Sequence, residues 1–422
     1  MKRIFSVAAL IIISIVSCQK LELKQPERIL ESEDNTVSLS TAANIASNFT
    51  NSESTFLTRS SAPTVKETFT ISDSDKQPLL HVINYEEGGF VLVAGDNRFK
   101  PIQAYSPKGC FSANKTDYPL GLKIWMEGIK DSLKTVRNNG LKQTTETQAA
   151  WLNYTEDASA TIKTRSLEPG GGMLPEADTL VGPFITDSWH QKSPYNDSLD
   201  VCAHYYGNDD FAGNYKPVVG CVPLAIARIL RYHHYSNSFS WNSMPDNTAT
   251  AATKSFIKDV HESVKSFAQN NDYGFSYTYF NNSQNPLGFG VEYGFPIGDI
   301  FTSQYGYASG YDRAYSTSSY SAMRRDLIDH SLPCIIVGQS LYNEIHAWIC
   351  DGYHYNLVYW YDYNNEPIGV INTYLHYCWG DEDPSWDGWF SSNSVYYQNA
   401  SFSFNMRLTH HISPIDYWNP FL

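Results

Sequence analysis

Two residues of this chain have the types and surroundings of a nucleophile and its base, Cys221 and His346. Cys221 precedes residues 222–233, whose apolar positions repeat with the period of a helix. Gly220 and Pro223 suit a helix start, because a proline in the first turn loses no backbone hydrogen bond. Cys221 would then lie at the helix N-terminus, where unpaired N–H groups and the helix dipole stabilise a thiolate. A buried, inert thiol is the alternative, and this segment alone leaves both open.

His346 lies in a segment, 345–350, in which apolar and other residues alternate, and Asp351 and Gly352 follow as a predicted turn. The pattern predicts a strand that carries one imidazole. Because His346 is far along the chain from Cys221, only the fold can bring the thiol and the imidazole together. A lone histidine on a strand is more often structural than catalytic, and 12 histidines make a chance pairing easy.

The composition excludes several classes of protein. Hydrophobic residues are 42% of the 422 residues and charged residues 18%, which is enough for a sizeable core and too apolar for a disordered chain. Thirty Lys and Arg against 44 Asp and Glu give a net charge of −14, and with no basic cluster nucleic acid is not an expected partner. Seven cysteines are too sparse for a disulfide scaffold, and the chain lacks the repeated long apolar runs of a multi-span membrane protein.

The N-terminus has the pattern of an export signal. Lys2 and Arg3 precede an apolar run over 4–16 that is too short for a permanent membrane span, and Ser17 and Cys18 follow. Residues 15–18 resemble a bacterial lipobox, so we expect a signal peptide over 1–18, lipidation of Cys18 and a polar tether over 19–37. The chain would be an outer-membrane or cell-surface lipoprotein, held to the membrane by the Cys18 acyl chains or released after processing. An ordinary signal peptide with an incidental cysteine is the alternative.

The remaining chain is predicted to divide into two domains joined by a linker. Residues 38–150 are expected to hold a helix after Ser40, strands over 79–85 and 90–94, and an amphipathic helix after Pro119. The linker is placed at 151–178, where a glycine run beside Lys163 and Arg165 suits an exposed, cleavable segment. The larger domain is 179–422, with an aromatic run over 353–363 that predicts an exposed hairpin or the border of a cleft. The fold class is α+β.

Four blocks of the larger region together resemble the streptopain family of secreted bacterial cysteine peptidases. They are 220–232 around Gly-Cys-Val-Pro, 346–352 beginning His-Ala-Trp, 189–196 and 379–390. Residues 82–98 and 104–106 resemble that family's propeptide. The resemblance covers most of the chain, and its Gly-Cys and His-Ala blocks are specific only in combination.

The resemblance implies a papain-like cysteine peptidase domain, with a helix that carries the nucleophile packed on a sheet that carries the base. Cys221 would attack the scissile carbonyl and form a thioester, and His346 would move the proton. Gln191 would donate to the oxyanion, and Trp379 would shield the bond that orients the histidine. Residues 38–150 would be an inhibitory prodomain. The expected partners are protein or peptide substrates and this prodomain, with no cofactor and no metal; Cys202, His204 and the 233–234 histidine pair lack zinc-site spacing.

One position departs from the family pattern. Cys378 replaces the asparagine that orients the histidine, and Asp381 replaces a tryptophan. A thiol is a weak hydrogen-bonding group, so we expect a more loosely held imidazole and reduced or retuned activity, unless Asn372 or Asp381 reaches it. A surface binding protein on a catalytically impaired peptidase scaffold is therefore the alternative function. A non-peptidase Cys–His enzyme such as a transamidase is a third interpretation.

Overall fold

The computed structural model describes the chain in twelve segments: 35–53, 63–114, 118–154, 177–204, 213–235, 238–271, 279–280, 286–287, 294–340, 344–361, 367–392 and 406–414. They belong to one structural unit, 35–422. Cys18 and most of the predicted linker lie outside the described residues. Among the residues described, no helix is long and apolar enough to cross a membrane.

The N-terminal part is an antiparallel meander with helices packed on it. Its elements are α1 (Leu39–Ser52), β1 (Val65–Ser72), β2 (Pro78–Tyr85), β3 (Phe90–Ala94), β4 (Ile102–Ser106), α3 (Leu120–Asn138) and α4 (Thr145–Leu152). Helix α1 begins two residues earlier than predicted: Ser38, not Ser40, is the N-cap, and its side chain accepts a hydrogen bond from the N–H of Thr41. The predicted hairpin and the helix after Pro119 are both confirmed.

The C-terminal part combines helices with the longest strands of the structure. Its helices are α6 (Cys221–His233), α7 (Ala251–Asn270), α8 (Ile297–Tyr305) and α9 (Thr317–His330), with short 3-10 turns η3 (Trp241–Ser243) and η4 (Pro384–Trp386). Its longer strands are β5 (Ala177–Val181), β10 (Ser309–Ala314), β11 (Cys334–Gln339), β12 (Ile345–Tyr361), β13 (Pro367–Cys378), β14 (Gly388–Ser391) and β15 (Met406–Ser413). Two small pairs stand apart, β6 (Cys202–His204) with β7 (Gly213–Tyr215) and β8 (Tyr279–Phe280) with β9 (Pro286–Leu287).

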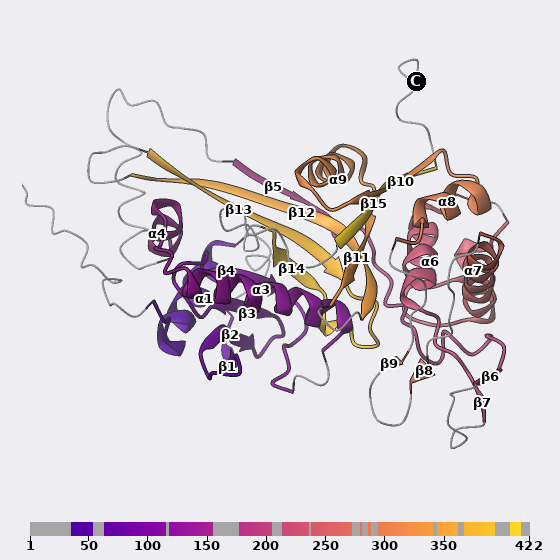
Figure 1. Cartoon of the computed structure of the whole chain (residues 1–422), viewed down its shortest axis with the longest axis horizontal. Coiled ribbons are helices and arrows are strands. Elements are labelled where there is room, and N and C mark those ends of the chain that lie inside the picture. Colours follow the sequence, from indigo (N-terminus) through magenta and orange to yellow (C-terminus); the bar gives the residue numbers. More distant parts are fainter. Residues whose placement is uncertain are drawn as a thin grey trace, which may run out of the picture. The chain divides into compact units, whose positions relative to one another are not determined.

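One antiparallel sheet runs through both parts, in the order β1-β2-β3-β4-β14-β13-β12-β11-β15-β10, with β5 added beside β12 (Figure 1). The two parts meet where β4 pairs with β14, through Tyr105 opposite Trp389 and Ala104 opposite Phe390. The α+β class is confirmed. The chain segments on either side of the predicted linker therefore share a sheet.

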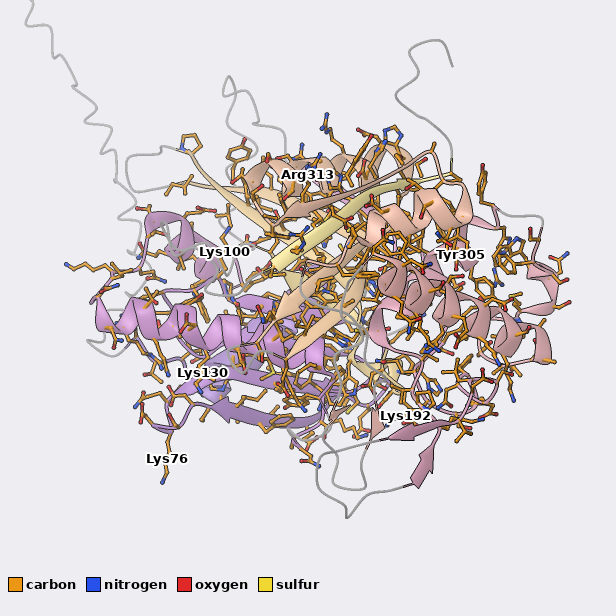
Figure 2. The ribbon with its side chains drawn as sticks, turned by 45° about the vertical axis from the view of Figure 1, so that its right-hand side comes forward. Lys76, Lys100, Lys130, Lys192, Tyr305 and Arg313 are labelled. Carbon is orange, nitrogen blue, oxygen red and sulfur yellow. The ribbon has the colours of Figure 1, made fainter. Side chains whose placement is uncertain are left out.

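The helix of Cys221 packs on the strand of His346. Apolar residues of α6, among them Val222, Ile226 and Ile229, share a buried core with Ala347 and Ile349 of β12. Residues of α7 cover the other side of α6 in the same core. Figure 2 shows the side chains that fill the space between these helices and the sheet. The apolar repeat that predicted the α6 helix is the face that this core buries.

The strand β12 is longer than predicted. The sequence suggests a turn at Asp351 and Gly352, but the strand continues to Tyr361 with only a register shift between Cys350 and Gly352. The continued strand pairs with β13 on one side and β5 on the other. The predicted exposed hairpin is thus in part covered: Val358 and Ile368 pack against a small cluster to which α4 contributes Ala149 and Ala150.

Candidate active site

Cys221 is the first residue of α6, as predicted. Gly220 before it has φ +89°, a left-handed conformation that glycine adopts without strain, and this turn delivers the thiol to the helix N-terminus. Burial alone would raise the pKa of Cys221. The hydrogen bond with His346, the positive charge of His346 and the N–H groups of Ala347 and Val222 together lower this pKa by more than burial raises it. The pKa of the thiol therefore lies below its ordinary value, which favours the thiolate.

His346 lies on β12 with 7% of its surface exposed, and its imidazole contacts the thiol of Cys221. Its Nε2 lies 3.0 Å from the carbonyl oxygen of Trp379 and must donate, because a carbonyl can only accept. Burial lowers the pKa of His346, but the bonds to Cys221 and Trp379 raise it above its ordinary value. A lowered thiol pKa beside a raised imidazole pKa favours a thiolate–imidazolium pair.

The group that orients His346 is a main-chain carbonyl rather than a side chain. Cys378, at the position of the family's asparagine, turns its thiol toward Asp351 instead. Asp381 affects His346 through its charge, which raises the pKa of the imidazole. The expected loosening of the imidazole is therefore not what the structure shows. Sequence reasoning missed this because a backbone carbonyl leaves no residue-type signal.

The other two predicted residues also lie beside Cys221. Gln191 lines the same small cavity as Cys221 and Trp379, and its carbonyl accepts the N–H of Val219, which ties it to the loop before α6. The ring of Trp379 is fully buried and lies 5.4 Å from that of Trp348, centroid to centroid. Gln191, His346 and Trp379 thus all lie around Cys221, so the four residues predicted for the catalytic site come together.

Helix α3 of the N-terminal part covers His346 and Trp379. In α3, Gly121 lies so close that a Cβ there would fall 2.5 Å from Cε3 of Trp379 and 3.0 Å from Cδ2 of His346. One turn further along α3, Ile124 approaches the ring of Trp348 beside Gly338. The helix after Pro119 therefore lies directly on the imidazole and the tryptophan that holds it, and glycine is the residue that permits the approach.

The comparisons with known proteins concern both parts of the chain. Residues 34–133 match the family described as Spi protease inhibitor. Streptopain of Streptococcus pyogenes is 29% identical over 160 residues, which are 37% of this chain and 33% of that protein. The chain is streptopain-like. Thiol protease/hemagglutinin PrtT of Porphyromonas gingivalis is 23% identical over 222 residues, 45% of this chain and 23% of that protein.

A solved structure shows the same fold. A fragment of prointerpain A of Prevotella intermedia, a mutant in which alanine replaces one cysteine, covers 82% of this chain and 98% of its own, with a TM-score of 0.51 and 15% identity. The resemblance to streptopain and the papain-like α+β fold are confirmed. The chain spans about a third of the length of streptopain in this match.

Buried charges lie beneath the site of this streptopain-like chain. Arg228 of α6 bonds Asp187 through Nε at 2.7 Å and the Asp187 carbonyl through Nη2, joining the helix to the segment before Gln191. Asp387 accepts the main-chain N–H of Trp379 at 2.9 Å. No role was predicted for Arg228, Asp187 or Asp387 from the sequence, although Asp387 lies in the 379–390 block. An arginine among the apolar positions of α6 was the available signal.

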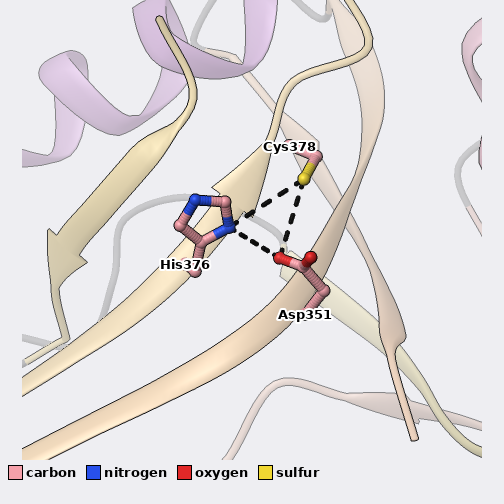
Figure 3. Close-up of side chains that lie close together, drawn as sticks. All are labelled: Asp351, His376 and Cys378. Atoms are coloured by element: carbon pink, nitrogen blue, oxygen red, sulfur yellow. Dashed lines mark hydrogen bonds and ion pairs between the residues drawn. The ribbon is translucent and has the colours of Figure 1, made fainter. Parts of the chain in front are cut away.

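A second cysteine–histidine contact lies close by (Figure 3). His376 Nδ1 is 2.7 Å from Asp351 Oδ1, and the Cys378 sulfur is 3.6 Å from that oxygen and 3.9 Å from that nitrogen. In the described part of the chain, Asp351, His376 and Cys378 form a group in which the atoms that could bind a metal ion all lie within 4.8 Å of one another. Burial and the charge of Asp351 raise the pKa of Cys378 well above its ordinary value, which disfavours the thiolate that a metal needs. The three side chains already bond one another.

Proposed function

We propose that this chain is a cysteine endopeptidase made as a zymogen. The observation that carries the proposal is the contact between Cys221, at the start of α6, and His346, whose Nε2 donates to the Trp379 carbonyl. The opposite pKa shifts of the two groups are those of a thiol activated by an adjacent imidazole. The relatives named streptopain and thiol protease support the same chemistry.

The proposed reaction proceeds through a thioester. The Cys221 thiolate attacks the scissile carbonyl carbon, and the oxygen takes up the negative charge beside Gln191 and the Cys221 N–H. His346 gives its proton to the leaving amine, the C–N bond breaks, and the acyl group stays on sulfur. Water then attacks the thioester and His346 accepts its proton. The C–S bond breaks, the carboxylic product leaves, and the Cys221 thiolate beside a protonated His346 is restored. Each preorganised oxyanion donor contributes about 2.7–4 kcal/mol to such a step.

Autoinhibition is proposed for the N-terminal part, residues 38–150. The support is the position of α3, where Gly121 lies against His346 and Trp379, and the match of residues 34–133 to a protease-inhibitor family. A substrate backbone cannot approach the Cys221–His346 pair while α3 lies there. Cleavage within 151–178 would then free the cleft.

Export as a lipid-anchored precursor is part of the proposal. The support is the sequence over 2–18, with two basic residues, a short apolar run and Cys18 after a small residue. We propose an outer-membrane or cell-surface location for the precursor, with substrates that are proteins or peptides outside the cytoplasm. Labelling with a radioactive fatty acid should mark the wild-type chain and leave Cys18→Ala unmarked.

Casein hydrolysis tests the catalytic proposal. A trace of trypsin, which cuts after Lys163 or Arg165, opens the linker and is then stopped with a serine-specific inhibitor. The processed wild-type chain is expected to hydrolyse casein, and Cys221→Ala to have no activity above background. Cys110→Ala, which removes the other half-buried thiol among the described residues, is the matched control and should keep wild-type activity. Equal hydrolysis by wild type and Cys221→Ala would end the proposal.

A further inference from the structure

The direction of the His346 ring depends on whatever holds Trp379, because the acceptor is the main-chain carbonyl of that residue. Trp379 comes directly after the last residue of β13, and Gly380 follows with φ +72°. The last pair of β13 with β12 is Cys378 opposite Ile349. Trp379 therefore lies just beyond the ladder, and other contacts must fix its carbonyl.

Both N–H groups of Trp379 donate to the short segment before β14. The main-chain N–H donates to Oδ1 of Asp387 at 2.9 Å, and the indole Nε1–H donates to the carbonyl of Trp386 at 2.9 Å. The Asp387 N–H in turn donates to the carbonyl of Pro384 at 3.0 Å, which closes the turn that presents the carboxylate. Trp379 is thus held on one side by Asp387 and orients His346 on the other.

The charge of Asp387 suits this contact. Burial raises its pKa to about 6, although Arg228, the Trp379 N–H and His376 each oppose the rise. The carboxyl group is therefore mostly ionised at neutral pH, and an ionised acceptor makes a shorter and stronger hydrogen bond than a neutral one.

We propose that Asp387 is a positioning residue that sets the orientation of His346 through Trp379. Among the interactions of the described residues, Asp387 has none with Cys221 or His346, so it acts only by fixing Trp379, whose carbonyl accepts the hydrogen bond from Nε2 of His346. The inference rests on the proposed peptidase function and adds the residue on which the geometry of its base depends.

The test compares Asp387→Asn and Asp387→Ala with Asp383→Asn in the full chain after linker cleavage. Asp383 is the matched control, because it lies in the same segment and accepts the N–H of Ser385 at 2.9 Å without touching Trp379. For Asp387→Ala, kcat is expected to fall about 10- to 100-fold, the loss typical of a misplaced catalytic group. KM should stay within about twofold of wild type, since substrate contacts are unchanged. Asp387→Asn, which keeps an acceptor oxygen without the charge, should lie between.

The pH profile of Cys221 alkylation by iodoacetamide provides the second readout. A misoriented imidazole stabilises the thiolate less, so the profile of Asp387→Ala should move to higher pH while that of Asp383→Asn stays at the wild-type position. Thermal melting shows whether Asp387→Ala folds. If it does not, the kcat and the alkylation profile of Asp387→Asn test the positioning role. Wild-type kcat and an unshifted profile in Asp387→Asn and in any folded Asp387→Ala would overturn the inference. If the wild-type chain fails to cleave casein, the peptidase proposal fails, yet the alkylation profiles still test the positioning.

Discussion

Two cysteine–histidine contacts lie close together in this chain, and their chemistry is opposite. The pKa of Cys221 is lowered beside His346, whereas the pKa of Cys378 is raised well above its ordinary value beside His376. Each thiol lies against an imidazole, and burial raises the pKa of both, so burial and residue type do not explain the difference.

The surroundings of the two sulfurs explain it. Cys221 faces the N–H of Val222 at the start of α6, the N–H of Ala347 on β12, and an imidazole whose own pKa is raised. Cys378 lies on a strand near the carboxylates of Asp351 and Asp387, and Asp351 already occupies the His376 nitrogen at 2.7 Å. A thiolate is therefore favoured at the first position and opposed at the second. The contact of cysteine with histidine is not sufficient for a nucleophile.

The largest expected effect separates the two histidines. His346→Ala should lower casein hydrolysis by at least about 10³-fold, because it removes the base. His376→Ala should leave hydrolysis within a fewfold of wild type but lower stability by about 1–3 kcal/mol, because Asp351 loses a buried partner. Initial rates and urea unfolding measure the two outcomes. A comparable loss of activity in a folded His376→Ala chain would contradict the distinction.

An intermediate effect is expected at Gly121, which lies against His346 of the Cys221–His346 pair. A Gly121→Leu side chain overlaps the Trp379 ring, and such overpacking costs about 1–3 kcal/mol. The cover should open more often, so the uncut chain should hydrolyse casein about 10-fold faster, since about 1.4 kcal/mol corresponds to that factor. Lys134→Leu, at an exposed position of α3, is the control. An uncut Gly121→Leu chain as inactive as wild type would show that α3 does not limit access.

The smallest effect is expected at Cys378. Since the Trp379 carbonyl already orients His346, Cys378→Ala should leave kcat within about twofold of wild type, and the lost sulfur should lower the melting temperature by a few degrees. Steady-state kinetics and thermal melting of the linker-cleaved chain measure both. A large fall in kcat would mean that the thiol contributes to the geometry of the base after all.

Local patterns carried much of the fold and part of the site. The helix of Cys221 and the strand of His346 have strong periodicity, and the glycine and proline around Cys221 mark where the helix begins. The Trp379 carbonyl accepts a hydrogen bond from His346, and Gly121 approaches the Trp379 ring. Both contacts arise from pairing between distant segments, for which no local pattern exists. The continuation of β12 through Asp351 and Gly352 was missed because this dipeptide is also typical of turns. Here it forms a bulge between two neighbouring strands.

The most direct test of the thiolate at Cys221 is the pH dependence of its reaction with iodoacetamide, followed for each cysteine by peptide mapping of the linker-cleaved chain. Cys221 is deprotonated above its lowered pKa and His346 stays protonated below its raised pKa, so Cys221 should react well below about pH 8.5, the ordinary pKa of a thiol. Cys378 should stay unmodified in the same samples. A Cys221 that reacts only above about pH 8.5, as a free thiol does, would contradict the account.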